Sequence, residues 1–221
     1  MTELAPWRSP LARALHRNRA LAYARYGQLA TVRPNGCPAN RTVVFRGFLD
    51  QAGLENGLKF VCDRRSHKVP ELQANPWAEF CWYFPKTREQ FRLGGAIAVV
   101  TAAGAEAPGG NPEAPSSHNG LATARDQTWQ ALSAGAKASF YWPQPGAPRA
   151  EAAAFTGLQV DESAPPEAFV LLVLQPQTVD HLELRGEPQT RQRYRLMQPD
   201  PAQPDLTSDP KEQWQQESIN P

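Results

Sequence analysis

The chain has 221 residues, of which 41 % are hydrophobic and 20 % charged, and its formal net charge is +1. This composition is too apolar for a disordered chain, and the balanced charge argues against nucleic acid or an anionic membrane as a partner. The three cysteines, Cys37, Cys62 and Cys81, form no CxxC pair, so neither a disulfide framework nor a metal site is predicted. We expect a cytoplasmic protein, because the longest strongly apolar run has six residues and indicates no membrane span.

The first half of the chain predicts one helix followed by strands. Ser9 and Pro10 are typical of a helix start, and apolar residues recur at helical spacing to predict a helix over 9–26. Pro34, Asn35 and Gly36 are typical of a tight hairpin turn. Short apolar runs predict five strands, over 28–32, 41–49, 58–62, 78–84 and 90–101. Strands without long helices between them pair antiparallel, which favours a small barrel.

The second half adds helices and returns to strands. A short helix over 66–74, with Ser66 as its N-cap, interrupts the early strands. The later elements are a low-complexity insertion at about 102–120, a helix over 123–140, strands over 169–174, 178–184 and 190–197, a proline-rich excursion over 198–210, and a closing strand over 214–219. We therefore expect one domain over 1–221, mainly β with peripheral helices (α+β), built on an antiparallel barrel.

Two arginines, Arg41 and Arg46, lie in an otherwise apolar predicted strand. Desolvated arginines are costly unless they meet an anion, so a bound phosphate is one explanation. The alternative is that both point outward at a sheet edge and discourage aggregation. Positions five apart in an ideal strand face opposite ways, which predicts separate roles for the two unless a bulge intervenes.

A second polar cluster, DRRSHK at 63–68, lies between a strand end and a helix start. Backbone amides at a helix start, the Ser66 hydroxyl and the Lys68 ammonium together favour phosphate binding. The alternative is a capped helix whose charges are simply solvated.

A third feature is the aromatic run Trp82, Tyr83 and Phe84, for which burial in the core is the default interpretation. Gln90 follows it in the next strand. A glutamine amide both donates and accepts hydrogen bonds, which suits the edge of a flavin ring.

These motifs together resemble the pyridoxamine 5′-phosphate oxidase-like, FMN-binding split β-barrel family, in its cyanobacterial and plant-type branch. The resemblance covers about 28–194 and the closing segment to 221. Its motifs are, in order, RTVVFR (41–46), KFVCDRRSHK (59–68), NPWAEFCWYF (75–84), REQF (88–91), WQALS (129–133) and DHLELRGEPQTRQRY (180–194).

The resemblance implies a homodimeric split-barrel flavoprotein with FMN near the subunit interface, some contacts coming from the second subunit. The FMN-binding residues that it implies are Arg41, Thr42, Val43, Val44, Val61, Cys62, Ser66, His67, Lys68, Gln90 and Arg193. Arg46 and Arg191 are implied as weaker substrate contacts. No catalytic residue is assigned, because the flavin carries the chemistry.

Departures from the family pattern affect the expected reaction. Gln189, Thr190 and Arg191 stand where the oxidase has an Arg-x-His motif, and Arg46 stands at the position of the substrate lysine. Flavin binding is therefore better supported than oxidation of a B6 vitamer. The leading hypothesis is an FMN-binding oxidoreductase acting on an unidentified small substrate.

Three alternatives stay open. One is a genuine pyridoxamine or pyridoxine 5′-phosphate oxidase, and another is a non-catalytic flavin-binding module. The third is a barrel that binds single-stranded nucleic acid through its aromatic strands, against which the near-neutral charge argues.

Overall fold

The computed structural model describes residues 4–49, 51, 54–106, 118–197 and 213–221. Its helices are α1 (Arg8–Asn18), α2 (Lys68–Ala74), α3 (His118–Gln130) and α4 (Ala134–Ala138), with single 3-10 turns η1 (Ser139–Tyr141) and η2 (Ala152–Phe155). Its strands are β1 (Tyr26–Val32), β2 (Pro38–Val44), β3 (Leu58–Asp63), β4 (Trp77–Phe84), β5 (Glu89–Thr101), β6 (Gly104–Glu106), β7 (Phe169–Glu183), β8 (Thr190–Met197) and β9 (Gln213–Ile219).

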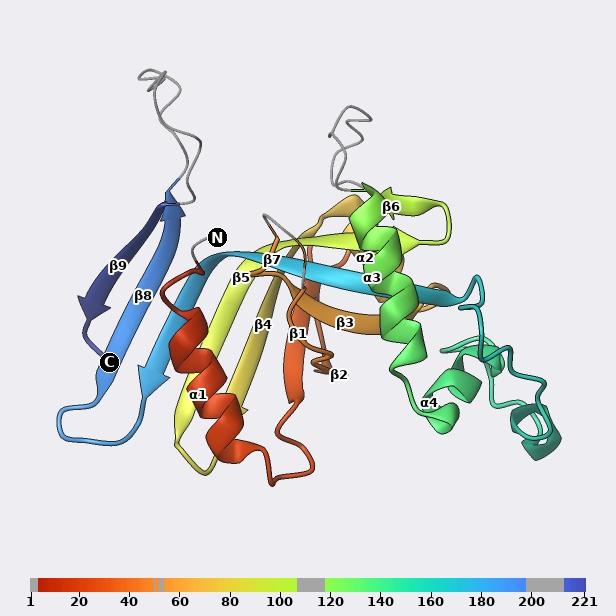
Figure 1. Ribbon diagram of the computed structural model, residues 1–221, viewed down its shortest axis with the longest axis horizontal. Coiled ribbons are helices and arrows are strands. Elements are labelled where there is room, and N and C mark those ends of the chain that lie inside the picture. The colour runs from red at the N-terminus through yellow and green to blue at the C-terminus, as the bar shows by residue number, and fades with distance from the viewer. Residues whose placement is uncertain (1–3, 50, 52–53, 107–117, 198–212) are drawn as a thin grey trace, which may run out of the picture.

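Six strands close into an antiparallel barrel. β1 pairs with β2 and β4, β5 pairs with β4 and β7, and β7 also pairs with β3. The chain beyond β2 completes the ring, because the Arg46 amide donates to the Lys59 carbonyl (2.8 Å) and the Lys59 amide donates to the Gly47 carbonyl (2.9 Å). β8 and β9 then extend the sheet beyond β7 (Figure 1). The antiparallel barrel expected from the sequence is confirmed.

The barrel interior is filled by aromatic side chains that alternate along the strands. Phe80, Trp82 and Phe84 of β4 are fully buried, and they stack in series with ring centroids 4.8–5.3 Å apart. Tyr83, between two of them, points to the opposite face and is 45 % exposed. The core interpretation of this aromatic run is thus correct for Trp82 and Phe84 and wrong for Tyr83, because side chains alternate across a strand.

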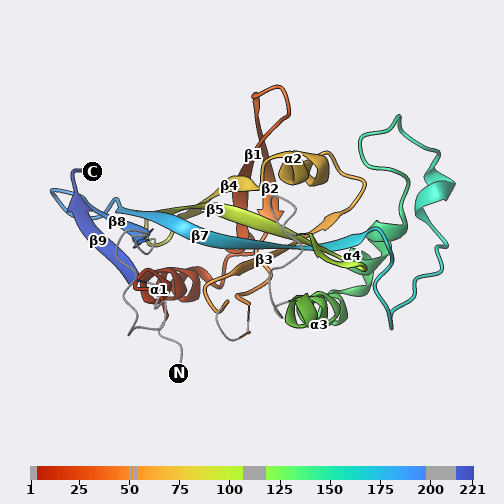
Figure 2. The same cartoon turned by 90° about the horizontal axis from the view of Figure 1, so that it is seen from above.

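The helices cover the sheet unequally. α1 and α3 lie on one side of the sheet and α2 lies on the other (Figure 2). α1 packs through Trp7, Leu11 and Ala14 against the barrel core. Among the described residues, no helix has both the length and the apolar character needed to cross a bilayer.

Several predicted boundaries are corrected. The helix predicted over 9–26 ends at Asn18, whose side chain is buried and bonds to Ala14, Thr87 and the Lys86 amide. The helix predicted over 123–140 begins earlier and is interrupted at Ser133, which caps α4. The strands predicted over 169–174 and 178–184 form one continuous β7.

The strand predicted over 41–49 is also shorter, since β2 ends at Val44. Beyond it the backbone leaves β1 and joins β3 through Gly47, whose φ of +108° is accessible mainly to glycine. Such a bend lets one strand take part in two sheets at a barrel corner.

The predicted insertion and excursion lie partly or wholly outside the described residues. β6 and the first turn of α3 occupy the two edges of the 102–120 insertion, while 107–117 lies outside the described residues. The excursion over 198–210 also falls outside them. The closing strand is confirmed, because β9 pairs with β8 from Arg191–Ile219 to Met197–Gln213.

Candidate functional site

Two adjoining pockets lie at the barrel edge formed by β2, β3 and α2, and they share Arg41 and Lys68. The barrel pocket, of about 320 Å³, is lined by Arg41, Thr42, Val43, Val44, Arg46, Val61, Cys62, Asp63, Lys68, Leu132, Ala136, Ser139, Phe140 and Pro145. The hairpin pocket, of about 690 Å³, is lined by Arg33, Pro34, Arg41, Ser66, His67, Lys68, Pro70 and Glu71. The two predicted cationic clusters, one around Arg41 and the other at 63–68, therefore meet at this edge of the barrel.

All nine of the predicted cofactor residues on β2, on β3 and at the start of α2 line one pocket or the other. Arg46, the predicted substrate contact, lines the barrel pocket together with Arg41. The expectation that Arg41 and Arg46 face opposite ways is therefore wrong. The chain bends after Val44 instead of continuing as an ideal strand, so the alternation of side chains is broken between them.

The cluster at 63–68 presents hydroxyl and ammonium groups to the pockets. Lys68 Nζ donates to Ser66 Oγ at 3.0 Å. Ser66 is not the N-cap of α2, because the helix begins one residue later and His67 occupies that position without a side-chain cap. Asp63 is held by Arg65, whose Nη2 lies 2.6 Å from its Oδ2. Lys68 and Ser66 are therefore the groups of this cluster that are best arranged for an anion.

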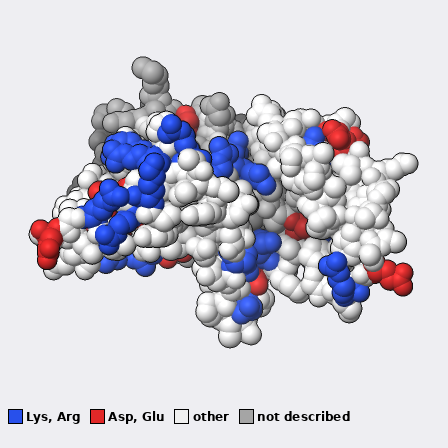
Figure 3. Space-filling view, turned by 90° about the horizontal axis from the view of Figure 1, so that it is seen from below, with Lys and Arg blue, Asp and Glu red and all other residues white. Residues whose placement is uncertain are grey.

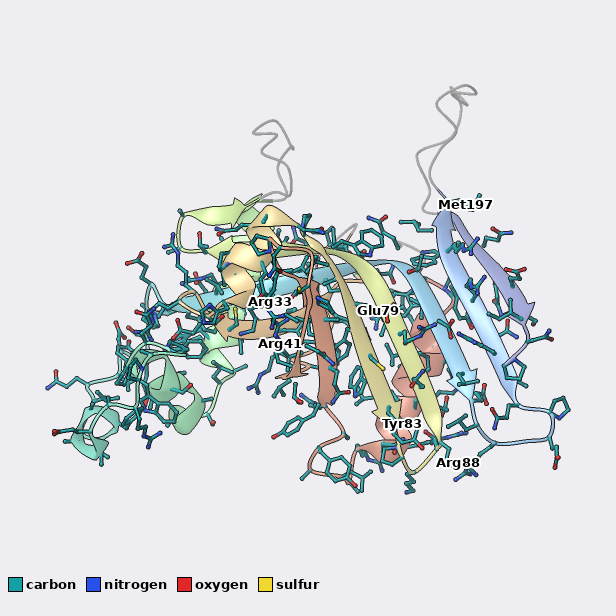
Figure 4. All side chains as sticks on the ribbon, turned by 180° about the vertical axis from the view of Figure 1, so that it is seen from behind. Arg33, Arg41, Glu79, Tyr83, Arg88 and Met197 are labelled. Atoms are coloured by element: carbon teal, nitrogen blue, oxygen red, sulfur yellow. The ribbon has the colours of Figure 1, made fainter. Side chains whose placement is uncertain are left out.

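Arg41 already has a carboxylate partner, which the sequence did not reveal. Its Nη2 lies 2.8 Å from Oε2 of Glu71, and its Nη1 donates to the hydroxyl of Thr31. Burial raises the pKa of Glu71, but hydrogen bonds from Thr31 and Arg41 outweigh burial and leave that pKa below its usual value. Glu71 is thus a buried anion within the cationic site (Figure 4 shows Arg41 beside Arg33 at the hairpin).

Arg46 is in a different situation. Its Nε is buried and has no hydrogen-bond partner among the described residues. Burial lowers the pKa of Arg46, and the nearby charge of Arg25 lowers it further. A buried, unpaired guanidinium nitrogen is costly, so Arg46 is the cation of the barrel pocket that would gain most from an anionic ligand.

The remaining walls of the barrel pocket are mainly apolar. Val43, Val44 and Val61 line one side, and Leu132 and Phe140 come from the helical region after α3. No role was predicted for this helical wall beyond the WQALS motif at 129–133. Its residues lie far from β2 and β3 along the chain, so no local pattern could assign them to the site.

The thiol of Cys62 is a neutral member of this wall. Burial raises its pKa to about 11, although Lys68 and the Ser66 hydroxyl act in the opposite direction. The thiol therefore stays protonated at neutral pH and serves as a weak hydrogen-bond donor.

Gln90, Arg191 and Arg193 do not line either pocket. Gln90 lies on β5 and the two arginines lie on β8, which are three and five strand positions from β2 in the sheet. Arg191 is also occupied, since its Nη2 lies 2.8 Å from Oδ2 of Asp180.

The fold and the site define a barrel protein whose edge has the charge and shape suited to an anionic small molecule. The two pockets are basic where they share Arg41 and Lys68, next to the Ser66 hydroxyl, and the barrel pocket is apolar along its strands. The volumes of both pockets are typical of small-molecule sites. This arrangement suits a ligand with a phosphate at one end and a flat apolar ring at the other.

Comparison with known proteins identifies that ligand class. The family model described as "Pyridoxamine 5′-phosphate oxidase, FMN-binding domain" matches residues 4–101. The pyridoxine/pyridoxamine 5′-phosphate oxidase 2 of Arabidopsis thaliana is 36 % identical over 83 % of this chain and 86 % of its own. A pyridoxamine 5′-phosphate oxidase-related, FMN-binding protein from Nostoc punctiforme is 48 % identical over the whole of both chains, with a TM-score of 0.83.

A more distant structure shares the fold. PhzG from Burkholderia lata, solved with tetrahydrophenazine-1-carboxylic acid, covers 99 % of this chain and 98 % of its own with a TM-score of 0.70 and 17 % identity. The chain belongs to the pyridoxamine 5′-phosphate oxidase-like, FMN-binding family, and its cofactor is FMN. The split-barrel fold expected from the resemblance is thereby confirmed.

Proposed function

We propose that this protein is an FMN-dependent oxidoreductase that acts on a small anionic substrate. The observation that carries the proposal is the barrel pocket, which joins the cationic groups of two separate sequence motifs to apolar walls. FMN, when bound, supplies the transfer of hydride or electrons, while the chain supplies binding and placement.

The phosphate end is assigned to Lys68, Ser66, His67 and Arg41. Lys68 and Ser66 are already hydrogen-bonded to each other, so the ammonium and the hydroxyl are held together before a ligand arrives. Arg41 adds a guanidinium whose position is fixed by Glu71. Charge-assisted hydrogen bonds of this kind are the stronger ones in proteins, which supports this end as the anchor.

The ring end is assigned to the strand residues. Val43, Val44 and Val61 offer apolar surface, while Thr42 and Cys62 offer a hydroxyl and a protonated thiol as hydrogen-bonding groups. A largely apolar wall excludes water from the ring and strengthens the few polar contacts that it makes.

A second copy of the chain would complete this site. In one chain Gln90 and Arg193 line neither pocket. They lie on the same sheet face as Tyr83, and Tyr26, Trp77 and Tyr83 are 45–49 % exposed. An exposed aromatic face is typical of a protein interface, which supports a homodimer in which this face is covered.

The substrate is assigned to the side of the pocket near Arg46. Arg191 is a weaker candidate than the sequence implied, because Asp180 already neutralises it. Arg46 has a buried Nε without a partner among the described residues and lines the same pocket as the proposed ring site. An anionic group on the substrate, a phosphate or a carboxylate, fits this cation.

Two alternatives are kept because specific observations favour them. The name of the Arabidopsis relative favours oxidation of pyridoxine or pyridoxamine 5′-phosphate, and production of pyridoxal phosphate would establish it. A non-catalytic flavin-binding module is favoured by Gln189, Thr190 and Arg191, which stand where the oxidase has its Arg-x-His motif. Such a module would bind FMN and show no turnover with any amine or reductant.

The free cysteines support a reducing, cytoplasmic location for all three functions.

The cofactor site is tested by the double variant Arg41→Ala, Lys68→Ala. We expect the purified wild-type protein to carry FMN and to show its visible absorbance, and the double variant to be isolated without flavin. The matched control is Arg64→Ala, Lys86→Ala, which removes one arginine and one lysine from outside the pockets and should keep its flavin. Full flavin content in both double variants would contradict the phosphate assignment.

A further inference from the structure

A group of metal-binding side chains lies at the opposite end of the sheet from the two pockets. Glu89 begins β5, and His181 and Glu183 end β7. The strand register sets Glu89 opposite Glu183 and Phe91 opposite His181, so alternate residues of both strands share one face. The three ligand atoms all lie within 4.8 Å of one another.

The imidazole is held in place for such a role. His181 is 3 % exposed, and its ring stacks on Phe91 with centroids 4.0 Å apart and an interplanar angle of 11°. This stacking directs Nε2 toward both carboxylates, at 3.0 Å from Oε2 of Glu89 and 3.9 Å from Oε1 of Glu183. A ring locked by packing loses little freedom when it coordinates an ion.

The spacing suits a small metal ion. Ligand atoms about 2.1 Å from a tetrahedral ion are about 3.4 Å from one another. The two measured distances, 3.0 and 3.9 Å, lie on either side of that value. The third pair, Glu89 and Glu183, lies within 4.8 Å, so a change of no more than about 1.4 Å in any of the three distances would place the atoms around one ion. The Glu183 side chain is 49 % exposed, which leaves a path from solvent and room for water as a fourth ligand.

The chemistry of the donors selects the class of ion. One imidazole nitrogen and two carboxylate oxygens suit zinc and its first-row neighbours, whereas calcium and magnesium prefer oxygen ligands alone. Two carboxylates also balance the charge of a divalent ion. The surroundings are basic. The positive charge of Arg17 interacts electrostatically with Glu89, and lysine and arginine side chains gather at this end of the molecule (Figure 3). This basic setting favours moderate rather than very tight affinity.

We propose that Glu89, His181 and Glu183 bind a divalent transition-metal ion, with Zn²⁺ as the best fit. The ion fastens the start of β5 to the end of β7. This site is separate from the two pockets. It was not predicted from the sequence, because the expectation of no metal site was based on the spacing of the cysteines, and none of these three ligands is a cysteine.

The experiment compares zinc binding by three full-length proteins that retain their flavin. They are the wild type, Glu183→Gln, and Glu187→Gln as a matched control from the neighbouring exposed turn. Each protein is treated with a chelator, dialysed to equilibrium against low-micromolar Zn²⁺, and analysed for metal by mass spectrometry. Because Glu183 and Glu187 are both exposed, neither change should prevent folding.

We expect one zinc per chain in the wild type and in Glu187→Gln, and binding at least about tenfold weaker in Glu183→Gln. Zinc should also raise the melting temperature of the first two proteins and not of the third. A wild type that binds no zinc overturns the proposal, as does equal binding by the two variants. Flavin content is measured in the same samples, so failure of this site is distinguished from failure of the proposed cofactor site.

Discussion

Replacing Glu71 by glutamine tests whether a buried carboxylate organises the cationic pocket. Glu71 accepts hydrogen bonds from Thr31 and Arg41, and Arg33 lies 3.9 Å away. The glutamine side chain has nearly the same shape and keeps one carbonyl oxygen as an acceptor. The change therefore removes the negative charge while leaving most of the packing in place.

The magnitude follows from the burial of the pair. The Glu71 side chain is 6 % exposed and that of Arg41 is 24 % exposed. Removing one member of a fully buried ion pair costs about 3–5 kcal/mol, and a hydrogen bond to a charged group contributes about 1.5–3 kcal/mol. Because Arg41 keeps contact with solvent and glutamine keeps one acceptor, we expect Glu71→Gln to lower the free energy of unfolding by about 1–3 kcal/mol.

The effect should depend on pH. The folded-state pKa of Glu71 is lowered below its ordinary value of 4.5, so its contribution to stability is present above that value. The contribution is lost as the pH falls through the folded-state pKa, where the carboxylate becomes protonated. The difference between wild type and Glu71→Gln should therefore be constant near neutral pH and shrink under acidic conditions.

Urea unfolding of the flavin-free proteins measures this difference without a contribution from cofactor binding. The control is Glu79→Gln, because the Glu79 side chain is 48 % exposed and lies 4.0 Å from Arg92. An exposed pair of this kind contributes no more than about 1 kcal/mol. Equal stability of Glu71→Gln and wild type at neutral pH, or a difference that grows on acidification, would refute the reasoning.

Three further changes test other parts of the structure. Gly47→Ala should lower the free energy of unfolding by about 1–2 kcal/mol, because the φ of Gly47 is +108°. The control, Gly135→Ala in α4, should be neutral or stabilising, and equal effects of the two changes in urea unfolding would contradict the role of Gly47 at the barrel corner. Arg46→Met removes a partly buried cation whose Nε has no partner among the described residues, so the flavin-free protein should lose less than about 0.5 kcal/mol, and a loss above about 2 kcal/mol would show that Arg46 has a structural partner. Trp77→Glu puts a charge on the exposed aromatic face, so it should halve the mass of the proposed homodimer in sedimentation equilibrium, and a dimer mass in both wild type and variant would place the interface elsewhere.

Much of the fold could be predicted, because its turns and strands are determined by residues that are close together in the sequence. Asn35 and Gly36 fix a hairpin, and Gly36 indeed has a φ of +81°. The corner after Val44 could not be predicted, because the apolar run continues without a break while the backbone changes its pairing partner. The same limitation explains the helix that ends at Asn18, where a buried side chain bonds to the distant Lys86 and Thr87.

The site was predicted where its residues belong to recognisable motifs and was missed where they depend on tertiary contacts. The cost of a cation in a strand and the chemistry of a helix start drew attention to Arg41 and Lys68, and the family resemblance then assigned them to the cofactor. Glu71 was missed, although it lies three residues after Lys68 and so faces the same side of α2. A carboxylate at that spacing beside a predicted phosphate site is the signal that could have revealed it.

The pairing of Arg41 with Glu71 changes how the cations of the pocket should be understood. A bound anion was one explanation for both strand arginines, yet Arg41 finds its anion within the chain. The buried Nε of Arg46 has no partner among the described residues, so an external anion stays the explanation for Arg46 alone. It follows that Arg41 is prearranged whether or not a ligand is bound, whereas Arg46 is the position at which an anionic group should gain most from binding. This asymmetry supports the proposed roles, with Arg41 as an anchor for the cofactor and Arg46 as a contact for the substrate.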